Sequence, residues 1–373
     1  MDMNVYAVAT PAVLVVVGLE AAYCLYQKNG YYRFDDAMAN FATAIGHQIT
    51  NVAVAAGVFA LFTAIHARWP VAEWGGTPLS FAALYLSLDF LFYWFHRAGH
   101  GINILWAAHA PHHSSEELNY TVGLRASLTQ RAASFLFYWP LAFVAKPDVV
   151  LPLAGLHLLF QLIPPTRVIT RLPKWIESWL NTPTHHRVHH GMNPKYLDKN
   201  FGGTFIVWDK MFGTYAAETE PVVYGILRPV GTFSPIAINL QYWKLLWKDA
   251  VAAPRYTDKV KLWFMPNGWR PDGIPPRPPL ISVFGREKLT ADLSMKDMKR
   301  MALQLPFLLL AMWMITRHAS PLSDWGKAAL GAAVWAVLIG WGATLDAARR
   351  GSPRPVQGKR TILPRAPEAI TAA

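Results

Sequence analysis

The sequence is short of cysteine and of charge. Its 373 residues include a single cysteine, Cys24, so neither an intramolecular disulfide nor a cysteine-built zinc or iron–sulfur site can form. Charged residues make up 16% of the chain, whereas a soluble domain carries about 25%. Hydrophobic residues make up 53%, which excludes an intrinsically disordered chain. The composition therefore predicts a membrane protein.

Long apolar runs support this prediction, because a helix needs about 20 apolar residues to cross the hydrocarbon core of a bilayer. The candidate runs are residues 5–26, 44–65, 78–95, 302–315 and 325–345. We expect the first run to be a retained span rather than a signal peptide, because no basic segment precedes it and no small-residue cleavage site follows it. The apolar stretch at 132–163 is interrupted by Pro140, Pro147 and Pro152, which predicts two short spans or a hairpin that dips into the bilayer.

The polar part of the chain is basic. Lysine and arginine number 35 against 23 aspartates and glutamates, a net charge of +12. The C-terminal pair of apolar runs returns the chain to the side that it left, so the polar stretch 164–300 and the tail share one face. The positive-inside tendency places that face in the cytoplasm. We expect no nucleic-acid partner, because no basic module with interleaved aromatic residues stands apart from the apolar runs.

These observations predict an all-α integral membrane protein, a transmembrane helical bundle with a helical cytosolic cap. The expected parts are N-terminal transmembrane helices in 1–95, a histidine-rich catalytic region in 96–300, a transmembrane pair in 301–345 and a basic, disordered tail in 346–373. The compact size and the absence of an organelle signal favour a bacterial inner membrane over the endoplasmic reticulum.

Histidines carry the chemistry. Nine of the 13 histidines fall into the motifs HRAGH (96–100), HAPHH (109–113) and HHRVHH (185–190). Residues spaced i, i+3 and i+4 share one face of a helix, so the rings within each motif can converge. Eight imidazoles exceed the need of one tetrahedral zinc and match two metal ions with about four nitrogens each. Imidazole suits iron, zinc, copper and nickel, and the position next to lipid favours iron.

Several residues near the motifs are candidates for supporting roles. We expect His185 to support the ligands, and His157 to be a buried structural histidine or a supplementary ligand. Asp89 lies two helical turns before the first motif, where its carboxylate can accept a hydrogen bond from a ligand imidazole or from another helix. Asp198 or Asn200 can orient an imidazole in the same way. The aromatic residues predicted to form a slot for a lipid chain are Tyr93, Trp94, Phe95 and Trp106.

The motif order HxxxH, HxxHH, HxxHH beside apolar runs resembles the fatty acid hydroxylase/sterol desaturase superfamily. The flanking segments 89–100, 106–127, 181–215 and 222–226 are similar to its alkylglycerol monooxygenase branch. The chain departs from relatives at Pro165, where many have a histidine, and at Gly101, where animal alkylglycerol enzymes have an acidic residue. The metal ligands that the resemblance implies are His96, His100, His109, His112, His113, His186, His189 and His190.

The resemblance implies a membrane-bound di-iron monooxygenase that hydroxylates a lipid C–H bond with O2, with cleavage of alkyl glycerol ethers to aldehyde and glycerol as one outcome. It implies two iron ions, for which zinc can substitute in a purified sample. The sequence has no haem-binding, Rossmann-type or cysteine-cluster motif, so we expect the electrons to come from a separate redox protein or from tetrahydrobiopterin. A sterol desaturase and a fatty acyl or headgroup hydroxylase remain open, as do a membrane zinc hydrolase and a metal-binding protein without turnover.

Overall fold

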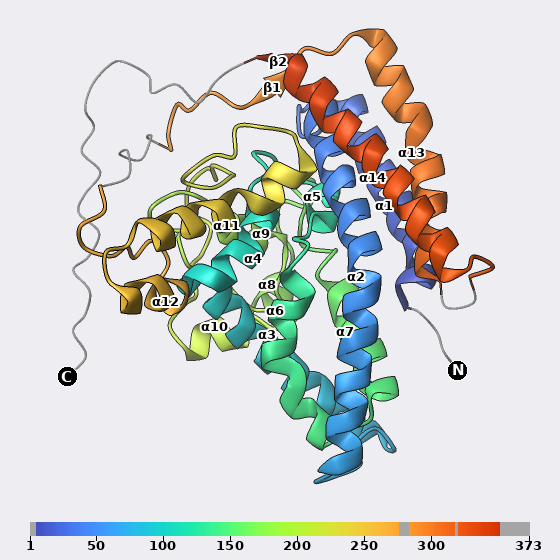
Figure 1. Ribbon diagram of the computed structural model, residues 1–373, viewed down its shortest axis with the longest axis vertical. Helices are drawn as coiled ribbons and strands as arrows, with labels where there is room; N and C mark the ends of the chain where they lie inside the picture. The colour runs from blue at the N-terminus through green and yellow to red at the C-terminus, as the bar shows by residue number, and fades with distance from the viewer. Residues whose placement is uncertain (1–4, 276–282, 318–319, 351–373) are drawn as a thin grey trace.

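The structure is a computed structural model that describes residues 5–275, 283–317 and 320–350. Within these residues the regular secondary structure is almost all helical (Figure 1). The strands β1 (Thr290–Ala291) and β2 (Arg349–Arg350) pair antiparallel in a two-stranded sheet. The all-α prediction is confirmed.

Five helices in the described part of the chain are long and apolar enough to cross a membrane. They are α1 (Val5–Gln27), α2 (Phe34–Arg68), α3 (Pro78–Gly101), α13 (Met295–Thr316) and α14 (Asp324–Ala347). Large apolar side chains face outward from them: Leu19 of α1 is 66% exposed and Phe307 of α13 is 74% exposed. Such exposed apolar surface suits contact with lipid, and the chain is a multi-pass integral membrane protein.

The apolar stretch at 132–163 contains two short helices rather than one long one. Helix α6 (Gln130–Tyr138) continues into the 3-10 helix η1 (Trp139–Phe143), and α7 (Pro147–Phe160) follows after a turn. Pro140 and Pro147 occupy the first turns of η1 and α7, where a missing N–H group breaks no hydrogen bond. Pro152 lies inside α7 without ending it, so this proline does not break the chain as predicted. The depth of the hairpin in a bilayer stays a prediction.

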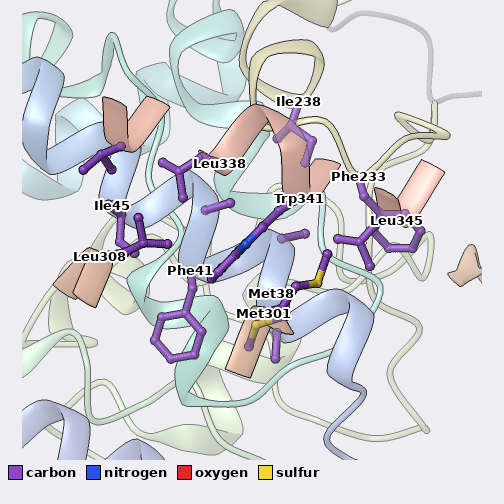
Figure 2. Packing of buried hydrophobic residues seen from close by; sticks show 14 of the residues in the cluster. Met38, Phe41, Ile45, Phe233, Ile238, Met301, Leu308, Leu338, Trp341 and Leu345 are labelled. Carbon is purple, nitrogen blue, oxygen red and sulfur yellow. The ribbon is translucent and has the colours of Figure 1, made fainter. Parts of the chain in front are cut away.

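The largest apolar core joins α2 to α13 and α14. Figure 2 shows Trp341 of α14 between side chains of the other two helices, among them Phe41 of α2 and Met301 of α13. Trp341 is 2% exposed, and its indole Nε1 donates to Gln304 Oε1 at 2.7 Å. This core fixes α2 against the C-terminal pair of spans, and α2 in turn borders the candidate site.

The shorter helices form a cap next to the spans. These helices are α4 (Asn103–His113), α5 (Tyr120–Leu124), α8 (Lys174–Glu177), α9 (Pro183–His189), α10 (Val207–Met211), α11 (Pro235–Ala252) and α12 (Tyr256–Phe264). In Figure 1, α4, α9, α11 and α12 lie to the left of α1, α13 and α14. Helix α4 follows α3 almost directly, and Asn103 fastens its start through hydrogen bonds to the carbonyls of Leu262 and Trp269.

The divisions predicted at 95/96 and 300/301 fall inside α3 and α13. Both helices are continuous across these positions, so these boundaries do not separate the chain into independent bodies. The four-part division by function stays a prediction. The basic tail predicted for 346–373 lies outside the described residues from position 351 onward.

Gly342 provides a test of how α14 packs against the cap. A Cβ atom at this position would lie 2.8 Å from the Cα of Ser234 and 2.9 Å from Cδ of Pro235. Because backbone cannot move aside cheaply, we expect Gly342→Ala to destabilise the protein by about 1–3 kcal/mol. Gly340→Ala in the same helix meets nothing within 4 Å and should be neutral or slightly stabilising. Thermal unfolding of both variants in detergent checks this, and equal shifts would contradict the packing.

Candidate metal centre

The three histidine motifs meet in one buried cluster. Helix α3 carries the first motif and α4 carries the second. The third lies on α9 and on His190, the residue that caps the C-terminal end of α9. One ring nitrogen from each of five histidines lies within 4.8 Å of the others: His96, His100, His109, His113 and His189. A second group under the same criterion contains His112, His113 and His190, so His113 belongs to both groups.

The facing nitrogens are spaced as ligands of a shared cation are spaced. The Nε2 atom of His113 lies 3.0 Å from that of His109, 3.2 Å from that of His100 and 3.1 Å from that of His189. The Nε2 atoms of His96 and His109 are 3.1 Å apart. A metal–nitrogen bond is about 2.1 Å long, so two ligands at right angles lie about 3.0 Å apart.

Backbone carbonyls fix the ring proton of two of these histidines. Nδ1 of His96 donates to the carbonyl of Phe201 at 2.8 Å, and Nδ1 of His189 donates to the carbonyl of Lys199 at 3.0 Å. A carbonyl only accepts, so the proton of each ring is on Nδ1 and each Nε2 presents a lone pair to the cluster. Burial, followed by the neighbouring histidines, holds the pKa of His189 well below its usual value. A metal ion therefore fits between these lone pairs better than extra protons do.

The second group also presents ring nitrogens that are available as acceptors. Nδ1 of His112 donates to the carbonyl of Arg125 at 2.8 Å, which leaves its Nε2 as an acceptor. The Nε2 atoms of His186 and His190 are buried and have no hydrogen-bond partner among the described residues. The ring of His190 lies 4.4 Å from that of His186 and 4.3 Å from that of His113. The structure thus brings all eight predicted ligand histidines together, with donor atoms suited to a metal.

One loop, residues 198–201, orients three of these rings. Besides the two carbonyls above, it places Oδ1 of Asp198 3.4 Å from Nδ1 of His100. Asp198 and Asn200 have φ of 56° and 57°, the left-handed region that Asp and Asn tolerate better than most residues. These two residues reshape the loop so that it faces the rings, and the role of Asp198 in orienting His100 stays a prediction.

Asn200 and His185 act on the backbone instead of on a ring of the cluster. The Asn200 side chain donates to the carbonyls of His185 and Ala216. Nδ1 of His185 accepts from the backbone N–H of Thr182 at 3.2 Å, which caps the start of α9. Both residues hold the loop and α9 in place, and Asn200 contacts the backbone instead of the imidazole predicted for it.

Asp89 bonds to other helices, which is one of the two alternatives predicted for it. Its carboxylate accepts from the backbone of Thr204 at 2.6 Å, from Trp208 Nε1 at 2.8 Å and from His157 Nε2 at 2.6 Å. Among the described residues, no imidazole of the cluster donates to it. Nδ1 of His157 accepts from the Gln161 amide at 2.9 Å, so both ring nitrogens of this buried histidine are engaged. Asp89 thus ties α3 and α7 to the segment after the orienting loop.

A cavity of about 640 Å³ runs from the histidines into the bundle of spans. Its inner end is lined by His96, His109, His112 and His186, and its walls come from α1, α2, α3, α6, α7 and α13. Most of the wall side chains are apolar, such as Phe62, Leu88 and Met312. The volume suits a small-molecule ligand, and the walls suit an alkyl chain.

Of the four aromatic residues predicted to line this slot, Phe95 does so. Tyr93 bonds to Thr214 at 3.0 Å, Trp94 packs 5.1 Å from the Phe212 ring, and Trp106 packs 5.1 Å from the His100 ring. The reason is helical periodicity: the face of α3 that carries His96 also carries residues 88, 92 and 95, whereas 93 and 94 point elsewhere. Counting back by four and by eight from His96 would have found Phe92 and Leu88.

We expect metal binding at pH 6.5 to release almost no protons. Burial lowers the pKa of His112 to about 4 and that of His186 to about 3, so both rings are already neutral at this pH. A site with ordinary histidines would release about half a proton per ring. Calorimetric titration of the metal-free protein with Zn²⁺, in buffers of different ionisation enthalpy, measures the release. Several protons released per ion would contradict the buried, neutral site.

The same depressed pKa values fix the sign of the stability change with pH. The unfolded chain takes up protons near pH 6.5, whereas the folded chain takes them up only near pH 4 at His112. The stability that these histidines contribute is therefore present above pH 6.5 and is lost as the pH falls toward 4. Unfolding of the metal-free protein across this range should show the loss.

Asp209 offers a test of the orienting loop. Its buried carboxylate accepts from the backbone N–H groups of Phe201 and Gly202, both at 2.7 Å, and so fixes the carbonyl that holds His96. Asp209→Asn turns a donor toward these N–H groups, and we expect metal affinity to fall by about 10–100-fold. Asp249→Asn, which weakens an ion pair with Arg270 in the cap, should leave metal affinity unchanged. Competition for Zn²⁺ with a chelator measures both, and equal affinities would contradict the role of Asp209.

Comparison with known proteins agrees with this geometry. Residues 81–214 match the family model for fatty acid hydroxylases. The chain is 37% identical over 288 residues to an alkylglycerol monooxygenase of Xenopus tropicalis, which covers 75% of this chain and 63% of the relative. It is 43% identical over 195 residues to that of Homo sapiens (52% and 44% covered), and 32% identical over 260 residues to that of Caenorhabditis elegans (66% and 51%).

The chain thus spans less than two thirds of the length of these curated relatives. No solved structure matches it. The matched residues 81–214 contain all three histidine motifs and the orienting loop. The comparisons support the fatty acid hydroxylase superfamily and, within it, the alkylglycerol monooxygenase branch.

Proposed function

We propose that this chain is a membrane monooxygenase that holds two iron ions and uses O2 to hydroxylate a C–H bond of an alkyl glycerol ether. The observation that carries the proposal is the position of the histidine cluster at the inner end of an apolar cavity between spans. The names of the relatives support the ether as the substrate class.

The eight clustered histidines would hold the ions, which supply O2 activation and C–H oxidation when bound. The part played by the chain is ligation, positioning and exclusion of water. The carbonyls of Phe201, Lys199 and Arg125 keep the ring protons on Nδ1, so Nε2 of His96, His189 and His112 stays free to ligate. The apolar walls hold the alkyl chain with one carbon beside the inner end and keep bulk water away.

The reaction balances with an external supply of two electrons and two protons. One oxygen atom of O2 enters the C–H bond and the other leaves as water. When the oxidised carbon is bonded to the ether oxygen, the product is a hemiacetal, which breaks down to a fatty aldehyde and glycerol. We propose tetrahydrobiopterin or a separate redox protein as the electron donor, because the sequence contains no motif for a second redox group.

The direct test is oxidation of 1-O-hexadecylglycerol by the purified, iron-loaded protein with tetrahydrobiopterin. We expect O2 consumption matched by hexadecanal, and none of this product without O2. His112→Ala should lower the rate by more than about 100-fold, because it removes a ligand from the second group.

The matched control is His66→Gln, since His66 bonds to the Ala142 carbonyl and to Glu73 outside the cluster. It should retain the rate of the parent protein. Metal-dependent turnover at the same rate without O2 would contradict the proposal and indicate a zinc hydrolase.

We also propose that the histidine cluster lies on the cytoplasmic side. Counting spans, the α2–α3 connection lies on the opposite side of the membrane from the cap. In a Cys24→Ser background, Val71→Cys in that connection should react with a membrane-impermeant maleimide in intact cells, whereas Thr257→Cys in α12 should not. The reverse pattern would contradict the orientation. The choice between a bacterial inner membrane and the endoplasmic reticulum stays a prediction that fractionation of the native host decides.

A further inference from the structure

Asn181 presents a hydrogen-bond acceptor at the inner end of the cavity. Its side chain is 5% exposed and lines the cavity together with His186 and Gly202. The side-chain oxygen Oδ1 is buried and has no hydrogen-bond partner among the described residues. A buried polar atom without a partner costs about 1–3 kcal/mol, so such atoms in native proteins call for an explanation.

The direction of this oxygen is fixed by the other half of the amide. Nδ2 of Asn181 donates to the carbonyls of Gly202 at 2.6 Å and Gly203 at 3.3 Å. Because carbonyls only accept, the amide cannot be turned round to place its oxygen there. The backbone N–H of Asn181 is also held, by the carbonyl of Thr204 at 2.8 Å. Nδ2 of Asn181 therefore bonds to the loop, and Oδ1 is the side-chain atom available to a molecule in the cavity.

Asn181 lies beside the place where oxidation is proposed to occur. Gly202, which accepts from it, follows Phe201, whose carbonyl holds His96. Of the other polar side chains at this end, the clustered histidines are the candidate metal ligands. His157 and Gln161 bond to each other, and His157 also bonds to Asp89. Outside the candidate ligands, Oδ1 of Asn181 is therefore an acceptor without a partner in the described residues that this end of the cavity offers to a ligand.

We propose that Oδ1 of Asn181 accepts a hydrogen bond from a hydroxyl group of the substrate and so selects lipids with a free hydroxyl near the oxidised carbon. The inference rests on the proposed function and specifies the polar part of the substrate. In an alkyl glycerol ether the hydroxyl groups lie only a few bonds from the ether oxygen. The hydroxyl can thus reach Asn181 while the adjacent chain carbon lies beside the histidines and the alkyl chain fills the apolar cavity.

The test compares two probes in the iron-loaded protein: 1-O-hexadecylglycerol, and the same lipid with both hydroxyls methylated. A methyl ether cannot donate and leaves Oδ1 buried without a partner, so we expect kcat/KM to favour the diol by about 10–100-fold, mainly through KM. In Asn181→Ala the preference should fall below about threefold. If Asn181→Ala does not fold, the parent protein still provides a test. A ratio of kcat/KM between diol and methylated lipid below threefold in the parent protein overturns the proposal.

Gln130→Ala is the matched control. Gln130 also lines the cavity, from α6, and its Oε1 is likewise buried without a partner among the described residues. We expect this variant to keep the preference for the diol. Loss of the preference in Gln130→Ala but not in Asn181→Ala would place the hydroxyl group at α6 and overturn the proposal.

A binding measurement separates this inference from the proposed function. Zinc-loaded protein is incubated with tritiated hexadecylglycerol, which is displaced by either unlabelled probe. The proposed function fails if the iron-loaded protein oxidises neither lipid. The role of Asn181 still stands in that case if the diol displaces the label about 10-fold better than the methylated lipid and if, of the two variants, only Asn181→Ala abolishes this difference. Equal displacement by the two probes in the parent protein overturns the role of Asn181 whatever the turnover shows.

Discussion

The fold brings imidazole nitrogens from three helices to one buried place. Nε2 atoms of His109, His100 and His189 lie 3.0–3.2 Å from that of His113. Where facing nitrogens both carry a lone pair, they repel each other unless a proton or a metal ion lies between them, and burial disfavours charged rings. A metal ion would therefore stabilise the fold as well as supply chemistry, since it would join α9 to the consecutive helices α3 and α4.

Backbone carbonyls, rather than acidic side chains, orient most of the rings whose Nδ1 has a hydrogen-bond partner. Three ligand rings donate to main-chain carbonyls, those of Phe201, Lys199 and Arg125. Buried carboxylates act one step further out, where Asp209 and Asp89 hold the backbone on either side of Gly203. Gly203 is required there, because a Cβ atom would lie 2.6 Å from Nε2 of His157. The neutral carbonyls orient the rings without adding charge to the centre, which leaves the cation as the main charge of the site.

The sequence predicted the parts of the site that depend on local periodicity. Histidines three and four apart fold onto one helix face, so the convergence of rings within each motif could be predicted, whereas the choice of eight ligands came from the resemblance and stays a prediction. Apolar runs located the five long helices of the described residues. It did not predict partners that depend on long-range packing. The carbonyl that holds His96 belongs to a residue 105 positions away, and nothing local to Asp89 indicates that it pairs with His157. The slot residues were partly wrong because closeness in sequence to the motif was used where the helix face decides.

Iron content and local iron structure can be measured together. The purified protein is loaded anaerobically with ferrous iron, the bound iron is counted per chain, and X-ray absorption gives the neighbours of each ion. If the clustered histidines hold the metal, we expect two ions per chain, with nitrogen neighbours at about 2.1 Å. Iron that is absent, or is bound mainly by oxygen or sulfur, would contradict this expectation.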